Sequence, residues 1–215
     1  MLHQFSAAEA TMGREIAALK SYLAIAGFLD WKHRETVLSI FDLQGITGVS
    51  KPMVLRGLQL LEDRGLVVIQ SRADRNTNVY ELGAMESHYR KVPQDVIGSN
   101  LKLIGNRGAV SLAALKLYVA MLYHRNEKTG DAAVSHRTLV DETGVRPELV
   151  KDGYKVLHTC GFVTVSRSSA LRELSASGFA TNAYKMHGDF VGLEAAVRRP
   201  GAIRSRQRKG IAPWA

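Results

Sequence analysis

Side chains suited to binding a nucleic acid gather in the stretch 47–82 of this 215-residue chain. A predicted helix over 50–64 carries one group of them on or beside its outer face, namely Ser50, Lys51, Met53, Arg56 and Gln59. Guanidinium, ammonium and amide groups at such positions donate hydrogen bonds to phosphate oxygens and to base edges in the major groove. The polar turn at 70–78 adds Arg72 and Arg75, which suit either a narrow minor groove or a solvated turn. Recognition of a DNA duplex is the chemistry that these residues predict.

A second group of cationic side chains lies further along the chain: Arg146, Lys151, Lys155 and Arg167. Glu148 and Asp152 stand among them, and carboxylates accept from cytosine but repel phosphates. The long turn that follows, 168–182, contains Leu171, Leu174 and Phe179, which favours a packing or dimerisation element over a probe of the groove. For this second group, contact with DNA and contact with protein both stay open.

The densest cluster of positive charge is the C-terminal tail. Residues 198–215 contain no acid and six cations, which are Arg198, Arg199, Arg204, Arg206, Arg208 and Lys209. The tail therefore supplies six of the net +9, and the rest of the chain holds 29 − 6 = 23 basic against 20 acidic residues. We expect the tail to contact phosphates without regard to sequence. The alternative is a solvated terminus that aids solubility.

Catalytic and metal-binding patterns are missing from the sequence. The run Gly105-Asn-Arg-Gly108 lacks the lysine and the strand–helix order of a phosphate loop. Seven scattered histidines and a lone cysteine, Cys160, give no zinc-ligand spacing. We therefore predict neither an enzyme nor a cofactor, and expect Cys160 to pack as a small hydrophobe. The single cysteine, the lack of a signal-peptide pattern and the lack of a membrane span predict a cytoplasmic protein with no membrane partner.

Residues that end and start helices determine how the first group is held. Gly48 suits the position after a helix over 41–47, because glycine adopts a positive φ without strain. Ser50 suits the N-cap of the next helix, where its hydroxyl can accept an orphan backbone N–H. The residues expected to face inward from that helix recur at helical spacing, and they are Val54, Leu58 and Leu61.

A longer helix is predicted before this pair of helices and a hairpin after it. The helix is expected to start at residues 6–9, which have capping-box spacing, and to continue to about residue 29. Because this is long for such a helix, its first turns are expected either to fray or to pack on another body, such as a second copy of the chain. A short strand is expected at 35–40, and strands at 66–69 and 79–82 form the hairpin. Helix, tight turn, helix and hairpin follow each other as in a winged helix-turn-helix, which places its second helix in the major groove.

Two features of the predicted second helix point to close neighbours. Gly57 lies in the middle of the helix, where glycine costs about 1 kcal/mol against alanine. Its counterpart Gly153 repeats the feature, which suggests that the backbone packs closely against another helix. Leu55 and Leu60 lie outside the predicted inward face. Leu55 could contact a thymine methyl, but we favour packing of one or both leucines on a neighbouring helix or protomer.

The whole pattern occurs twice. Ala18-Leu-Lys20 matches Ala114-Leu-Lys116, and Thr47-Gly-Val49 matches Thr143-Gly-Val145, each at an offset of 116 − 20 = 96 positions. An internal repeat of this kind decides the architecture. We predict an α+β, mainly α chain with two tandem winged helix-turn-helix domains related by internal duplication. The expected parts are domain 1 (1–84), a linker (85–110), domain 2 (111–188), and a C-terminal helix with the basic tail (189–215). In the linker we expect a short helix near 94–97, and we expect the rest of it to be exposed or to lie along DNA.

The first copy resembles the winged helix-turn-helix domains of MarR-type bacterial regulators, and more closely those at the N-terminus of plasmid and phage replication proteins. The runs that carry the resemblance are Thr47-Gly-Val-Ser-Lys51, Leu61-Glu-Asp-Arg-Gly-Leu-Val67 and Arg75-Asn-Thr-Asn-Val-Tyr80. The resemblance covers 17–82, and 113–187 by the repeat. It implies base reading at the positions of Ser50, Lys51, Met53 and Arg56. The tandem arrangement also resembles two-winged-helix plasmid replication initiators, and the small tandem winged-helix subunits that bridge chromosome-condensing complexes without reading DNA.

These observations lead to three functional hypotheses. The first is a sequence-specific double-stranded DNA-binding protein, a transcriptional regulator of a bacterial or mobile-element locus. The second is a plasmid or phage replication initiator that binds origin repeats. The third is a tandem winged-helix protein-interaction module without base readout. The expected partners are double-stranded DNA, a second copy in a homodimer formed through the first helix or the long turn, and a protein of the replication or transcription machinery.

Overall fold

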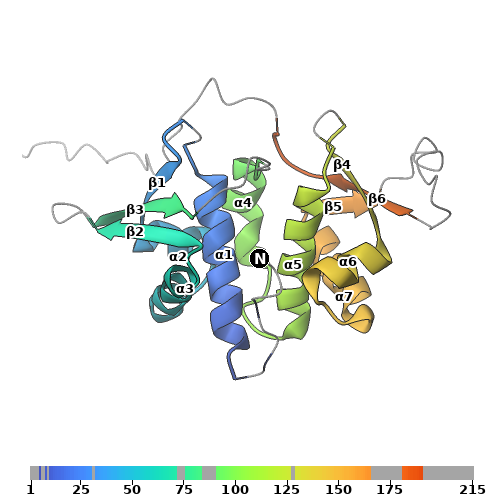
Figure 1. The fold of residues 1–215 in the computed structure, drawn as a ribbon, viewed down its shortest axis with the longest axis horizontal. Helices are drawn as coiled ribbons and strands as arrows, with labels where there is room; N and C mark the ends of the chain where they lie inside the picture. The colour runs from blue at the N-terminus through green and yellow to red at the C-terminus, as the bar shows by residue number, and fades with distance from the viewer. Residues whose placement is uncertain are drawn as a thin grey trace, which may run out of the picture.

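The computed structural model describes residues 5, 8, 10–30, 32–71, 76–83, 91–126, 129–165 and 181–190, and these residues form two halves joined by a linker (Figure 1). The first half contains α1 (Met12–Gly27), β1 (Glu35–Ser39), α2 (Ile40–Thr47), α3 (Lys51–Asp63), β2 (Val67–Ser71) and β3 (Thr77–Leu82). The linker contains α4 (Gln94–Asn100) and a short 3-10 helix, η2 (Leu101–Leu103). The second half contains α5 (Ala109–Tyr123), β4 (Asp131–Ser135), α6 (His136–Thr143), α7 (Pro147–Thr159), β5 (Val163–Val165) and β6 (Thr181–Met186). The expected α+β, mainly helical class is confirmed.

Each half carries a small antiparallel sheet with its last strand in the middle. The strand orders are β1-β3-β2 and β4-β6-β5. In the first sheet Val37 pairs with Val79 and Ile69 pairs with Tyr80. The same order of elements, helix, strand, helix, helix, strand, strand, thus occurs in both halves. Each described helix is too short or too polar to cross a membrane.

The turn between α2 and α3 follows the predicted local rules in part. Gly48 ends α2 with a φ of 66°, and Gly144 ends α6 with a φ of 62°. Ser50 takes the N-cap position of α3, but its side chain makes no capping hydrogen bond, contrary to the prediction. The reason is Pro52, which has no N–H to donate, while the N–H of Met53 donates to the Ser50 backbone oxygen at 2.9 Å. The cap of α2, which the sequence analysis missed, is the stronger one, since the Ser39 hydroxyl accepts from the Asp42 N–H at 3.0 Å.

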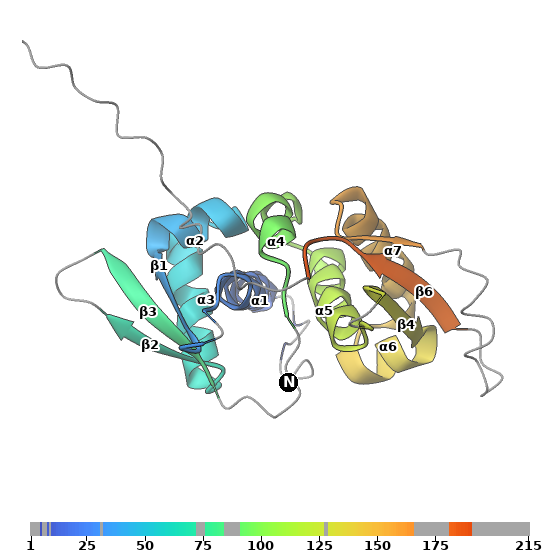
Figure 2. The ribbon, with the colours of Figure 1, turned by 90° about the horizontal axis from the view of Figure 1, so that it is seen from above.

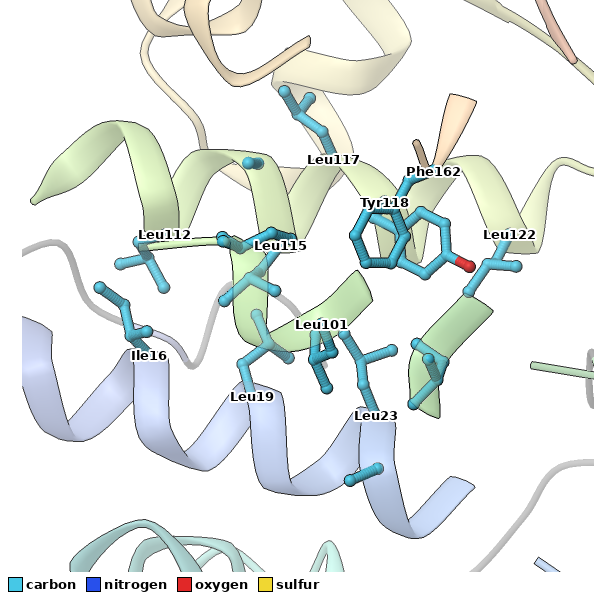
Figure 3. Packing of buried hydrophobic residues seen from close by; sticks show 14 of the residues in the cluster. Ile16, Leu19, Leu23, Leu101, Leu112, Leu115, Leu117, Tyr118, Leu122 and Phe162 are labelled. Carbon is cyan, nitrogen blue, oxygen red and sulfur yellow. The ribbon is translucent and has the colours of Figure 1, made fainter. Parts of the chain in front are cut away.

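The centre of the molecule is the pair α1 and α5, which lie side by side and run in the same direction (Figures 1 and 2). Figure 3 shows Ile16 facing Leu112 and Leu19 facing Leu115 across their boundary. All four side chains are at least 98% buried. Since 112 − 16 = 96 and 115 − 19 = 96, each residue meets its own counterpart in the repeat, as at the axis of a two-fold dimer.

This packing corrects two expectations about α1. The helix begins at Met12 after Thr11, later than the 6–9 capping spacing, of which the structure describes only Ala8. The residues buried on it run from Glu15 to Gly27 with the exception of the half-buried Tyr22. The buried part of α1 is therefore covered by α3, α5 and the other helices of the same chain, whereas its first turn, Met12 to Arg14, is not buried.

The linker is also different from the prediction. We expected the linker to be exposed or to lie along DNA. Instead α4 lies between the two halves (Figure 2), and the linker residues Val96, Ile97, Leu101 and Ile104 are buried. These apolar residues fill the space beside α1, where the side chain of Ile97 would lie 3.2 Å from a Cβ at Gly27. The linker is thus part of one continuous core rather than a tether.

The close approach predicted from the mid-helix glycines is confirmed. A Cβ at Gly57 would lie 2.7 Å from the backbone nitrogen of Ala18, and a Cβ at Gly153 would lie 2.9 Å from Cδ1 of Leu117. Leu55 is exposed as predicted, whereas Leu60 is buried. The burial of Leu60 agrees with the expectation that one or both of these leucines pack on a neighbouring helix, since α3 packs on α1 along a broader face than Val54, Leu58 and Leu61 alone provide.

Candidate nucleic-acid interface

The outer face of α3 is the strongest candidate surface. The helix is held from behind by its buried residues Val54, Leu58, Leu60 and Leu61, which pack towards α1. This leaves Lys51, Arg56 and Gln59 exposed on the opposite side, with Met53 half-buried beside them and Ser50 exposed at the start. The structure therefore brings together the five residues of the first predicted group on one helix, and we call them the α3 outer face.

The cations of the α3 outer face have no acidic partner among the residues that the structure describes. The recorded contact of Arg56 is from Nη1 to the sulfur of Met53 at 3.9 Å. Gln59 is different, because its Nε2 donates to Asp63 Oδ1 at 2.9 Å and this bond has to break before the amide can bind a base. Lys51 and Arg56 are thus the side chains free to bind an anion.

The matching face of α7 is partly neutralised by its own carboxylates. Arg146 Nε lies 3.4 Å from Glu148 Oε1, and Lys155 Nζ lies 2.9 Å from Asp152 Oδ1. The hydrogen bond from Lys155 lowers the pKa of the Asp152 carboxyl, and the charges of Lys155 and Lys151 act in the same direction. All three basic side chains of the predicted second group on this helix are exposed. Phosphate binding at this face has to compete with the two ion pairs.

The remaining predicted site residues lie outside the described part of the chain: Arg72, Arg75, Arg167, Arg204, Arg206, Arg208 and Lys209. The long turn at 168–180 and the basic tail lie outside it too. Of the expected last helix at 189–197, the structure describes Asp189 and Phe190, which are not helical. The two candidate helices that are described, α3 and α7, lie on opposite flanks of the α1–α5 pair (Figures 1 and 2).

A buried lysine that the sequence analysis did not single out lies behind the turn into α3. Lys20 is completely buried, and its Nζ donates to Thr47 O at 2.9 Å, Ile104 O at 2.5 Å and Asn106 Oδ1 at 2.7 Å. Burial lowers the pKa of this amine to about 8, against which the nearby Cys160 acts weakly. Its counterpart Lys116 donates to Thr143 O at 3.1 Å. A lysine at the same place in both copies of the repeat, among mostly apolar neighbours, is the signal that could have found this pair.

A partly buried ion pair fixes the C-terminal end of α3. Both guanidinium nitrogens Nη1 and Nη2 of Arg64 donate to the Glu15 carboxylate at 2.8 Å. Arg64 also lies over the ring of Phe5, 4.9 Å from its centre. Glu15 is only 2% exposed, so this two-pronged contact ties the end of α3 to the first turn of α1.

Cys160 is buried at the end of α7 and has no disulfide partner, in keeping with its predicted role as a small hydrophobe. Burial raises the pKa of its thiol.

Neither the family models nor the curated proteins with which the chain was compared contain a match. The function is therefore inferred from the residues and geometry of this chain.

Proposed function

We propose that this protein binds double-stranded DNA in a sequence-specific manner through the outer face of α3. The observation that carries the proposal is that Lys51 and Arg56 are exposed and unpaired with any described carboxylate, on a helix whose opposite face is locked onto α1. The element order of each half and its three-stranded sheet support a winged helix-turn-helix, in which this helix enters the major groove. Two such domains related by duplication make up the proposed architecture.

In the proposed complex, Lys51 and Arg56 contact base edges or phosphates from the start and middle of α3. Arg72 and Arg75, which lie between β2 and β3 in the sequence, contact the flanking minor groove in this proposal. The basic tail adds affinity that does not depend on sequence. We further propose that the chain regulates transcription at a bacterial or mobile-element locus, with origin binding in replication as the alternative. Homodimerisation stays a prediction.

A second candidate function is protein interaction through the second half without base readout. The ion pairs Arg146–Glu148 and Lys155–Asp152 favour it, because they reduce the positive charge that α7 offers to phosphates. The exposed Leu55 on α3, 46% accessible, gives the same hypothesis some support in the first half.

The test is selection of duplexes from a random pool by the full-length protein, followed by binding of the best duplex to variants. Arg56→Ala is expected to lose about 1–3 kcal/mol of binding free energy and to relax the preference at one base pair. The matched control is Arg137→Ala, which removes an exposed arginine of α6 that pairs with Asp141. A pool from which no preferred sequence emerges contradicts the proposal and leaves protein interaction as the function.

A further inference from the structure

The direction in which α3 leaves the body of the protein is set by the short turn from Gly48 to Ser50. Two backbone carbonyls at the start of this turn, those of Thr47 and Gly48, point to groups outside the helix-turn-helix pair. The carbonyls at a helix end have no partner within the helix, so such contacts satisfy them and fix their direction. The residues that bind these two carbonyls therefore control the orientation of α3.

The first of these residues is Lys20 on α1. Three acceptors surround its Nζ, which are the oxygens of Thr47, Ile104 and the Asn106 side chain. An ammonium has three N–H donors, so each acceptor receives one. A neutral amine has only two and must release one acceptor. The charged form of Lys20 thus ties the end of α2 to the segment that leads from the linker into α5.

The second residue is Asn106 in that segment. Its Oδ1 accepts from Lys20, and its Nδ2 donates to Gly48 O at 2.7 Å. The linker also packs directly on Gly48, since a Cβ there would lie 3.0 Å from Cβ of Lys102. The turn is therefore held between α1 on one side and the linker on the other.

The second half has a simpler arrangement. Lys116 donates to Thr143 O, and within the described residues this is the sole bond of its Nζ. The additional contacts of Lys20 come from the linker and belong to the half whose outer helix presents Lys51 and Arg56 without acidic partners. The stronger support thus coincides with the candidate reading helix.

We infer that Lys20 and Asn106 are positioning residues that orient α3 for base readout. This inference rests on the proposed function. Asn106 lies only three residues before α5 begins at Ala109, so the segment that holds the turn continues directly into the second half.

The first experiment compares the full-length protein with Asn106→Ala. Asn106 is exposed, so the variant should fold, and Ser99→Ala on the exposed surface of α4 is the control. We expect Asn106→Ala to reduce the ratio of affinities for the selected and a random duplex by roughly 10-fold, the factor typical of one lost hydrogen bond to a charged group. Affinity for the random duplex should stay within about 2-fold. An unchanged ratio overturns the inference.

The second experiment needs no DNA and separates this inference from the proposed function. Hydrogen exchange of the amides of Val49, Met53 and Val54 is measured in the free protein. Asn106→Ala should accelerate it roughly 10-fold relative to Ser99→Ala. If exchange accelerates but the wild-type protein prefers no duplex, the clamp exists and the proposed function fails. If exchange is unchanged, positioning by Asn106 is wrong whatever the protein binds.

Lys20→Met tests the other residue, with Lys116→Met as its counterpart in the second half. Exchange of the amides of Val49, Met53 and Val54 should be accelerated roughly 10-fold in Lys20→Met relative to Lys116→Met, because only Lys20→Met removes the donor of the Thr47 carbonyl. An equal rate of exchange in the two variants contradicts the role of Lys20.

Discussion

Replacing Gly57 by alanine should destabilise this protein, although alanine is the better helix former. On an exposed helix the change would gain about 1 kcal/mol. In α3 the added Cβ would lie 2.7 Å from the backbone nitrogen of Ala18 and 2.8 Å from the carbonyl carbon of Ala17. Both atoms belong to the backbone of α1 and cannot rotate away. Ordinary contact begins at 3.4 Å, so α3 has to move by about 3.4 − 2.7 = 0.7 Å.

A gap of that size between α1 and α3 forfeits about a quarter to a half of the dispersion energy of the contacts that it opens. The contacts belong to Val54, Leu58, Leu60 and Leu61, each worth about 1.5–3 kcal/mol when fully buried. The loss outweighs the gain in helix propensity, and we expect Gly57→Ala to lower the free energy of unfolding by about 1–3 kcal/mol, as at other overpacked sites. Binding to the selected duplex should weaken as well, because α3 is displaced.

The assay is urea denaturation of three alanine variants. Gly45 in α2 has no atom within 4 Å of the added Cβ, so Gly45→Ala should be stabilising by about 0.5–1 kcal/mol. Gly153→Ala should be less harmful than Gly57→Ala, because the nearest atom, Cδ1 of Leu117 at 2.9 Å, ends a flexible side chain. If Gly57→Ala were as stable as Gly45→Ala, the close packing of α3 on α1 would be refuted.

Two further predictions concern buried charges. Arg64→Met leaves the carboxylate of Glu15 buried without its partner, and we expect it to lower the free energy of unfolding, measured by urea denaturation, by about 3–5 kcal/mol. The double variant with Glu15→Gln should recover most of this loss. An equal loss in both variants contradicts the ion pair. The pKa of Lys20 is lowered by burial to about 8, so the unfolded chain binds this proton more tightly than the folded one. The stability of the wild type relative to Lys20→Met should therefore rise with pH from about 8 to the ordinary lysine pKa of 10.5, and a fall across that window refutes the lowered pKa.

The order of elements was predictable because local signals agree with the tertiary structure. Gly48 and Gly144 end their helices, and the spacing of Val54, Leu58 and Leu61 marks the buried face of α3. The repeat added weight, since two copies of each signal coincide. The mid-helix Gly57 was informative for the same reason, because a residue unfavourable for the local structure has a tertiary explanation.

The features that escaped the sequence analysis depend on which surfaces meet. Val96, Ile97, Leu101 and Ile104 are too few to reveal by periodicity that the linker enters the core. Lys20 appeared as an ordinary charged residue, because its three acceptors come from positions 27, 84 and 86 residues away. The α3 outer face was identified as a group of residues, but the bond from Gln59 to Asp63 depends on rotamers that no sequence pattern reveals.

The most direct test of DNA recognition through α3 is binding across a salt series, for the full chain and for a chain that ends at Val197. The slope of log K against log salt gives about 0.9 per phosphate neutralised. We predict that removal of the tail reduces this slope, while the shortened chain still prefers its selected duplex over random DNA by about 10³-fold or more. Loss of all binding with the tail, or binding without preference, would contradict base readout by α3 and favour a scaffold for protein partners.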